Sequence, residues 1–82
     1  MNQAIQFPDR ESWDEKLQAV CFPVMVNGIQ LTCAITGKIL FQRFGKGDPL
    51  EIFCTHRWDL EDQAQALIEA QQEDAQGWVW LS

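Results

Sequence analysis

Residues 19–36 read AVCFPVMVNGIQLTCAIT, in which Asn27-Gly28 separates two apolar runs. An Asn-Gly dipeptide between apolar runs is the strongest short-range signal for a β-hairpin with a two-residue turn. Side chains alternate between the two faces of a strand, so one register brings apolar residues opposite each other on a single face. The pairs are Val26–Ile29, Val24–Leu31, Phe22–Cys33 and Val20–Ile35. A slip of one residue would destroy this match, and the sequence therefore predicts the register together with the hairpin.

Pro23 indicates what lies on the outer side of the first hairpin strand. In the predicted register Phe22 and Val24 hydrogen-bond to the partner strand, so the missing N–H of Pro23 faces away from that strand. We therefore expect this side to be a sheet edge, at least locally. Cys21 and Met25 are then placed on the outer face of the hairpin near that edge.

The segments that flank the hairpin are assigned from turn signals and periodicity. Ala4–Phe7 is expected to form a short first strand, and residues 10–16 a loop or a single helical turn. Gly37–Phe44 is open to two interpretations, a short helix or a third strand. A helix would have Thr36 as its cap and Gly45 after its end, and it is favoured because Leu40, Phe41 and Phe44 fit one helical face.

A long helix is predicted from Asp48 to about Gln72, with Asp48 as its cap and Pro49 in its first turn. Its apolar stripe follows spacings of three and four residues through Leu50, Phe53, Arg57, Leu60, Ala64, Leu67 and Gln71. Trp78–Leu81 is expected to form a closing strand that is apolar on both faces, so it must be covered on both sides or lie in an interface. The predicted fold class is α+β: a small antiparallel sheet of the hairpin and the C-terminal strand, packed through its Val20/Ile35 face against one short and one long helix.

Length and composition limit the classes of protein that need to be considered. The 82 residues are enough for a single domain, residues 1–82, with a modest core. Three cysteines argue against a disulfide framework, and the register puts Cys21 and Cys33 on opposite faces, where they cannot bridge. No signal peptide or membrane-spanning run is recognisable. We therefore expect a cytoplasmic protein with reduced thiols.

The charge is concentrated in the last third of the chain. Residues 1–57 hold six acids and six bases, whereas residues 58–82 hold six acids and no base, which gives the net charge of −6. Such a field repels nucleic-acid phosphates and anionic membranes, so we expect neither as a partner. Acids near a helix C-terminus also oppose the helix dipole, and two uses for them remain open: contact with a basic protein, or solubility of a small protein. The candidate interaction face consists of Asp59, Glu61, Asp62, Glu69, Glu73 and Asp74.

Cys54-Thr55-His56 is the only place in the sequence where a cysteine and a histidine lie close together, and Arg57-Trp58 follow it. Two residues apart on a helix, Cys54 and His56 point in directions that diverge by about 200°, which argues against a Cys–His nucleophile or a shared metal ligand. Arg57 lies within the apolar stripe, where we expect its stem to cover the core and its guanidinium to pair with Glu61 four residues on. No catalytic motif, metal site or cofactor motif is recognisable. His56, Arg57 and Trp58 remain a candidate pocket.

Four segments of the chain together resemble the YrdB-like family of short bacterial proteins, which is grouped as a domain of unknown function. The segments are IQFPDR at 5–10, VNGIQLTCAI at 26–35, HRWDLE at 56–61 and QGWVWL at 76–81. The resemblance covers nearly the whole chain. It implies a bacterial cytoplasmic protein with an α+β fold and a short helix at residues 37–44. It implies no catalytic or binding residues, because no activity is assigned to the family.

Three hypotheses for function follow from these features. The leading one is a non-enzymatic accessory protein that uses its acidic helix face to bind a basic protein surface. The second is a homodimer formed through exposed apolar surface, either Trp78/Trp80 or the Cys21/Met25 edge. The third is a ligand-binding protein or small enzyme with a site near Trp58, Arg57 and His56.

Overall fold

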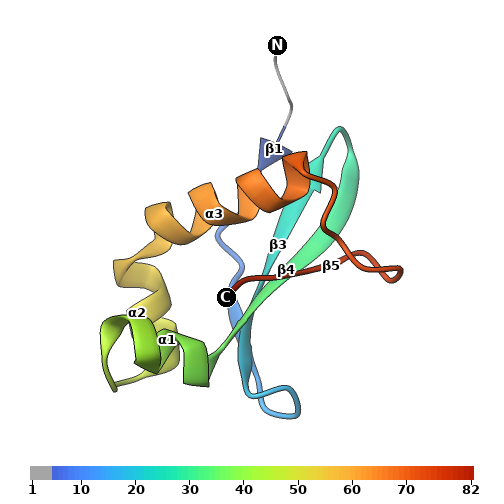
Figure 1. Ribbon diagram of the computed structural model, residues 1–82. Helices are drawn as coiled ribbons and strands as arrows, with labels where there is room; N and C mark the ends of the chain where they lie inside the picture. The colour runs from blue at the N-terminus through green and yellow to red at the C-terminus, as the bar shows by residue number, and fades with distance from the viewer. Residues whose placement is uncertain (1–4) are drawn as a thin grey trace.

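The computed structural model describes residues 5–82 as a five-stranded mixed sheet with three helices on one face, which confirms the predicted α+β class (Figure 1). The chain order is β1 (Ile5–Gln6), β2 (Ser12–Asp14), β3 (Ala19–Val26), β4 (Ile29–Thr36), α1 (Gly37–Phe44), α2 (Pro49–Thr55), α3 (Arg57–Glu69) and β5 (Trp78–Trp80). The strands lie in the order β1-β3-β4-β5, and β2 also pairs with β3.

The hairpin of β3 and β4 has the predicted register at every position. Val26 lies opposite Ile29, and the pairing continues without a bulge to Ala19 opposite Thr36. Asn27 and Gly28 have φ values of 52° and 83°, the left-handed backbone that a two-residue hairpin turn requires. The local sequence therefore determines both the turn and the alignment of the two longest strands.

The outer side of β3 is covered by two short strands with an interruption at Pro23. β1 pairs with the end of β3 at Met25 and Val26, and β2 pairs with its start at Ala19–Cys21. No strand of the described chain pairs with β3 on this side between them, which confirms the local edge expected at Pro23. The loop or helical turn expected at residues 10–16 is wrong, because Ser12–Asp14 is a strand. The expected first strand is shorter than predicted, and its start at Ala4 lies outside the described residues.

β5 pairs in parallel with β4, so the expectation of a purely antiparallel sheet is corrected. Thr32 lies opposite Trp78 and Ala34 opposite Trp80. The reason is the connection between these strands, which runs through all three helices over one face of the sheet and returns the chain to the end where β4 began (Figure 1). A crossover of this kind produces a parallel pair, whereas a short hairpin produces an antiparallel one.

α1 confirms the helical interpretation of residues 37–44. The Thr36 hydroxyl accepts a hydrogen bond of 3.2 Å from the Ile39 N–H, which caps the first turn. Gly45 follows the last turn with a φ of 94°, a backbone conformation that glycine adopts without strain.

The single long helix predicted from Asp48 to Gln72 is wrong, because the chain breaks at His56 into α2 and α3. The Asp48 carboxylate caps α2 by accepting from the Leu50 N–H at 3.0 Å, as predicted. α3 ends at Glu69, where Gln71 takes a left-handed φ of 58° and the final carbonyls are satisfied by a Schellman motif. The break keeps the apolar stripe of both helices against the sheet while changing the direction of the chain.

The core lies between the helices and the predicted Val20/Ile35 face of the sheet. Phe22 of β3 and Phe53 of α2 are fully buried, with ring centroids 4.7 Å apart, and Leu60 of α3 is buried beside them. β5 is split between two environments, because Val79 is buried while Trp80 is 42% exposed on the opposite face, stacked on Trp78. No helix of the described residues is long and apolar enough to span a bilayer.

Candidate functional site

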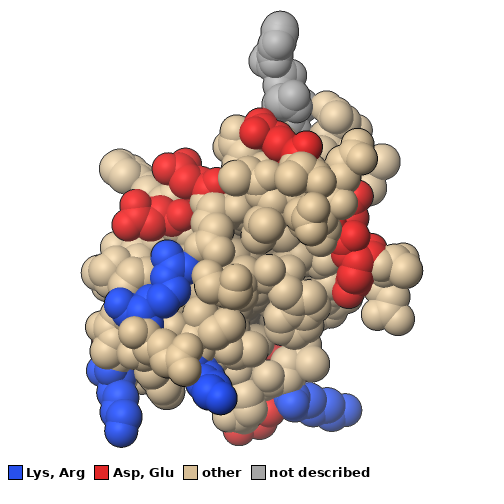
Figure 2. All heavy atoms as spheres, viewed as in Figure 1, with Lys and Arg blue, Asp and Glu red and all other residues tan. Residues whose placement is uncertain are grey.

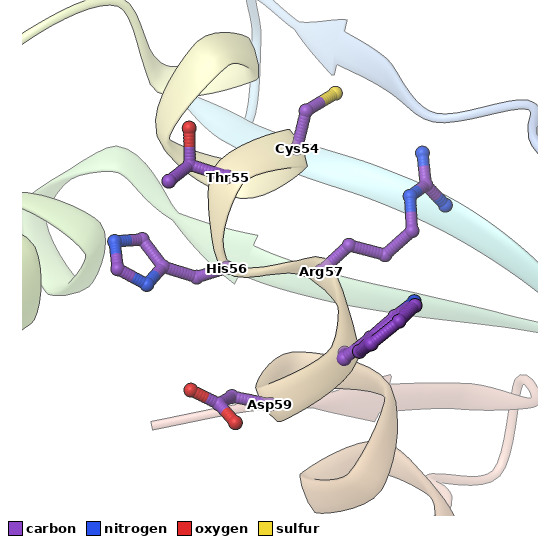
Figure 3. A pocket seen from close by; sticks show the side chains of 6 residues that line it. Cys54, Thr55, His56, Arg57 and Asp59 are labelled. Atoms are coloured by element: carbon purple, nitrogen blue, oxygen red, sulfur yellow. The ribbon is translucent and has the colours of Figure 1, made fainter.

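The break between α2 and α3 forms a shallow pocket of about 300 Å³, lined by the consecutive residues Cys54–Asp59. It contains the three residues of the predicted candidate pocket, His56, Arg57 and Trp58. Figure 3 shows that their surroundings differ, because His56 projects to one side of the chain while Cys54 and Arg57 project to the other. The pocket is therefore a notch in the backbone at the break, and its side chains do not converge on one point.

Arg57 binds acidic side chains from two separate parts of the chain. Its guanidinium donates to Glu11, and it lies 3.3 Å from Glu61 and 3.5 Å from Asp9. The group also lies over the Phe53 ring, 5.1 Å from the centroid, a distance typical of a cation–π contact. The predicted pairing with Glu61 is confirmed, and the contact with Glu11 could not be predicted because the two residues are 46 positions apart.

The ionisation of this cluster follows from the contact between Arg57 and Glu11. The hydrogen bond from Arg57 holds the pKa of the Glu11 carboxyl below its usual range, because it stabilises the charged form. The same bond raises the pKa of Arg57 above its ordinary value, although burial acts in the opposite direction. Both side chains are mostly buried, with 17% and 19% of their surface exposed. Arg57 is therefore a structural cation that joins the start of α3 to the N-terminal segment.

The position of Glu11 depends on the interruption of the sheet at Pro23. Between Gln6 and Ser12 the chain leaves β3, since Pro23 offers no N–H for pairing. Five residues of this segment lie opposite three residues of β3, so the segment bulges away from the sheet. Glu11 and Asp9 are in the bulge, which explains how they reach the helix junction.

Cys54 and His56 occupy separate environments, consistent with the divergence predicted from helix geometry. The Cys54 thiol donates to the Glu11 carboxylate at 3.3 Å, and burial together with this carboxylate raises the pKa of the thiol. The His56 ring stacks on Phe44, with centroids 3.8 Å apart and planes tilted by 9°. A neutral thiol with its histidine turned away lacks the base that a cysteine nucleophile requires. This arrangement gives no support to Cys–His catalysis.

Trp58 is the most exposed large apolar side chain in the described part of the protein, with 82% of its surface accessible. It lies in the first turn of α3, next to Asp59 and four residues before Asp62. Residues spaced by three, four and seven positions share a face of a helix, so Trp58 and Asp62 lie on the same outer face as Glu69. Asp59, Asp62 and Glu69 are exposed, and none of them forms a salt bridge within residues 5–82. We call Trp58, Asp59, Asp62 and Glu69 the α3 outer face.

The other three residues of the predicted acidic face lie elsewhere or are already bonded. Glu61 is half-buried and turned toward Arg57. Asp74 belongs to the turn before β5, where its carboxylate accepts from the Gln76 and Trp78 N–H groups, each at 2.9 Å. Glu73 is exposed in the segment after α3. The predicted set of six is therefore divided by the structure, and only three of its acids share the outer face of α3.

The charged side chains are separated on the surface shown in Figure 2. Acidic side chains lie over α3 and the segment that follows it, whereas basic side chains lie mainly around α1 and the lower end of the molecule, where an acidic group is also present. No group of three or more His, Cys, Asp or Glu side chains in residues 5–82 is arranged to hold a metal ion. The acidic side chains that the sequence concentrates in residues 58–82 are therefore spread over α3 and the segment after it, and they do not form one continuous patch in this view.

These features define a small two-layer α+β domain with a bulged sheet edge tied to a broken helix. The family described as "Protein of unknown function (DUF1488)" matches residues 5–81, and the chain belongs to this family. It is 62% identical to the uncharacterized protein YrdB of Escherichia coli K12, and equally to that of Shigella flexneri, over 99% of each chain.

A solved structure supports the same relationship. The 1.60 Å crystal structure of a DUF1488 protein of unknown function from Shewanella loihica PV-4 is 32% identical and superposes with a TM-score of 0.92. The match covers 99% of this chain and 94% of that one. The family suggested by the resemblance of the sequence is confirmed.

Proposed function

We propose that the protein is a non-enzymatic interaction module of the bacterial cytoplasm that binds a basic protein surface through the α3 outer face. The observation that carries this proposal is Trp58, which is 82% exposed beside two unpaired aspartates in the described chain. Tryptophan is costly to expose and is enriched among residues that dominate binding energy at protein interfaces.

The chemistry of this face favours an arginine or lysine side chain as the group that is recognised. An indole is the best aromatic partner for a cation, and a carboxylate beside it adds a charge-assisted hydrogen bond. Asp62 lies one helical turn after Trp58, so one cation can contact the ring and this carboxylate together, while Asp59 adds negative charge nearby. The acidic field around α3 also speeds the approach of a basic partner and repels acidic ones.

The rigidity of the α2–α3 junction supports this role. Arg57, the residue before Trp58, is fixed through Glu11 and Glu61, and His56 is fixed by its stacking on Phe44. A side chain in a helix whose preceding residues are held by tertiary contacts loses less conformational entropy on binding than one on a mobile loop. The junction therefore presents Trp58 in a defined place.

The test is capture from bacterial lysate with tagged protein, washed at low and then moderate salt and analysed by mass spectrometry. We expect a discrete basic protein that moderate salt releases, because contacts between exposed charges are screened. Asp62→Lys should reduce capture at least about tenfold, since it replaces attraction by repulsion. Glu51→Lys is the control: it makes the same change of charge at an exposed residue of α2, outside the α3 outer face, and should leave capture intact. Capture that ignores salt, or survives Asp62→Lys, would contradict the proposal.

Self-association through the uncovered face of the sheet is a second candidate. Trp78 and Trp80 stack with centroids 5.7 Å apart on this face, near Leu17, which is 40% exposed. Self-association by pairing at strand edges has less support. At the β5 edge, Asp74 already forms hydrogen bonds with the outward N–H and C=O of Trp78. At the β3 edge, β1 and β2 already pair beside Met25 and Cys21. Light scattering at high concentration tests this candidate, and a monomeric mass would eliminate it.

A further inference from the structure

A groove separate from the α3 outer face lies between the β2–β3 turn and the starts of α1 and α2. Its volume is about 620 Å³, within the range of about 300–1,000 Å³ typical of small-molecule sites. The apolar part of its lining comes from four separate segments of the chain and consists of Trp13, Leu17, Phe41 and Pro49. In Figure 1 the turn that forms one wall lies below the start of α1.

The aromatic wall of the groove is held in place before any ligand binds. The Trp13 indole N–H donates to Glu15 at 3.0 Å, which fixes one end of the ring. At the other end the ring lies so close to Gly37 that an added Cβ would be 3.1 Å from Trp13 Cη2. Gly37 is thus the residue that lets the ring lie against the start of α1. A wall that is fixed in this way loses little entropy when a flat or extended apolar body packs on it.

Leu17 also lines the groove, and the turn that carries it leaves this side chain 40% exposed. The Asp14 carboxylate accepts from the N–H groups of Lys16 and Leu17, at 2.9 and 3.0 Å, and Gln18 takes a left-handed φ of 53°. The turn is therefore well defined although it presents a leucine to solvent. An exposed leucine in a defined turn beside a fixed indole provides apolar surface for a ligand to cover.

Lys38 is the one charged side chain among the residues that line the groove. The other polar lining groups are already bonded, since the Gln18 amide donates to Glu15 and the Thr36 hydroxyl accepts from Ile39. Lys38 forms no ion pair within residues 5–82, and it lies in the first turn of α1. A ligand that covers the apolar walls would therefore find one unneutralised positive charge at the margin of the groove.

We propose that this groove binds a small organic anion with an apolar body, such as an aryl or medium-chain carboxylate, with its charged group beside Lys38. The apolar body packs on the Trp13 and Leu17 side chains, and the carboxylate complements the positive charge of Lys38, which forms no ion pair within the described residues. This site is independent of the proposed interaction with a basic protein, because it uses a different surface and the opposite charge.

The test uses the indole N–H signals of the four tryptophans in ¹H–¹⁵N spectra during titration with decanoate. Trp13 lines the groove, Trp58 is on the α3 outer face, and Trp78 and Trp80 are on the sheet face, so each surface has its own reporter. We expect the Trp13 signal to move in a saturable way while the Trp58 signal stays in place. Decyltrimethylammonium has the same chain length and the opposite charge and should bind at least about fivefold more weakly. Equal binding of both amphiphiles, movement of another indole instead, or no movement of Trp13 at millimolar decanoate would overturn the proposal.

Two exposed substitutions separate the parts of the site without disturbing the core. Lys38→Gln should weaken the binding of decanoate about threefold or more. The binding of decyltrimethylammonium should become no weaker, because only the anion is attracted by the lysine. Lys46→Gln removes the same charge from an exposed turn outside the groove and should have no effect. Leu17→Ser should weaken the binding of both amphiphiles to the same extent, because it removes apolar surface from the groove. If Lys38→Gln and Lys46→Gln behave alike, at unchanged melting temperature, the assignment of Lys38 is refuted.

Discussion

Replacing Arg57 by methionine tests the tie between the N-terminal bulge and the helix junction. Methionine retains an apolar stem over Phe53 but removes the cation that faces Glu11 and Glu61. An exposed ion pair contributes about 0–1 kcal/mol, and breaking a fully buried one costs about 3–5 kcal/mol. The Arg57 and Glu11 side chains, at 17% and 19% exposure, fall between these limits. We therefore expect the free energy of unfolding to fall by about 2–3 kcal/mol at pH 7.

The dependence on pH gives this prediction a second signature. The pKa of Glu11 is lower in the folded chain than in the unfolded chain, so its pairing stabilises the fold fully above the unfolded pKa of about 4. This stabilisation is lost as the pH falls through the folded-state pKa, where the carboxylate is protonated. The difference between wild type and Arg57→Met should therefore shrink as the pH is lowered below about 4.

Urea unfolding followed by tryptophan fluorescence measures both effects. In a domain of this size the predicted loss corresponds to a fall in melting temperature of about 10–20 °C. Arg10→Met is the matched control, because Arg10 is exposed on the same bulge and forms no ion pair in the described chain; it should change stability by less than about 0.5 kcal/mol. The structural role assigned to Arg57 is refuted if Arg57→Met lowers the free energy of unfolding no more than this control does. It is also refuted if the loss caused by Arg57→Met is the same below pH 4 as at pH 7.

Three further predictions concern single residues. Asp74→Ala should lower the free energy of unfolding by about 1–2 kcal/mol, since its carboxylate accepts two backbone N–H bonds, whereas Glu73→Ala should be nearly neutral in the same urea assay. A thiol reagent at pH 8 should label exposed Cys54 in the folded protein but should label Cys33 only after denaturation. The reason is that burial raises the pKa of the Cys33 thiol to about 12. Labelling of Cys33 in the folded protein would contradict its place in the core. Gly28→Ala should cost about 1 kcal/mol in thermal unfolding because of its φ of 83°, and an unchanged stability would argue against the left-handed turn.

The parts of the fold that local sequence controls could be predicted, and the reasons are visible in the structure. The hairpin needs only Asn27-Gly28 and the alternation of apolar residues around it. α1 needs only the cap at Thr36 and the glycine at its end. In each case the residues that determine the structure are neighbours in the chain, so their geometry can be worked out without knowing the rest of the fold.

The parts that depend on distant contacts could not be predicted. No proline or glycine marks the break at His56, which is set by packing of the ring on Phe44 and of Phe53 on the sheet. The short strand β2 carries little periodicity in three residues, and its pairing with β3 is a tertiary contact. The parallel direction of β5 depends on the path of the helices across the sheet.

The candidate site shows the same division. The pairing of Arg57 with Glu61 follows from their spacing of four residues and was predicted, whereas the contact of Arg57 with Glu11 joins distant segments. The acidic character of α3 was recognised from composition, but the assignment of Asp74 to a turn required the structure. The exposure of Trp58 could not be predicted, because an aromatic residue next to an apolar stripe is more often buried.

Capture from bacterial lysate by wild type, Trp58→Ala and Trp80→Ala, compared side by side at low salt, tests the proposed role of the α3 outer face most directly. The two substitutions remove exposed tryptophans from different surfaces, α3 and the sheet, and neither residue is part of the buried core. We predict that Trp58→Ala loses the basic partner while Trp80→Ala retains it. Retention of the partner by Trp58→Ala together with its loss by Trp80→Ala would contradict this account and assign the interaction to the face of the sheet.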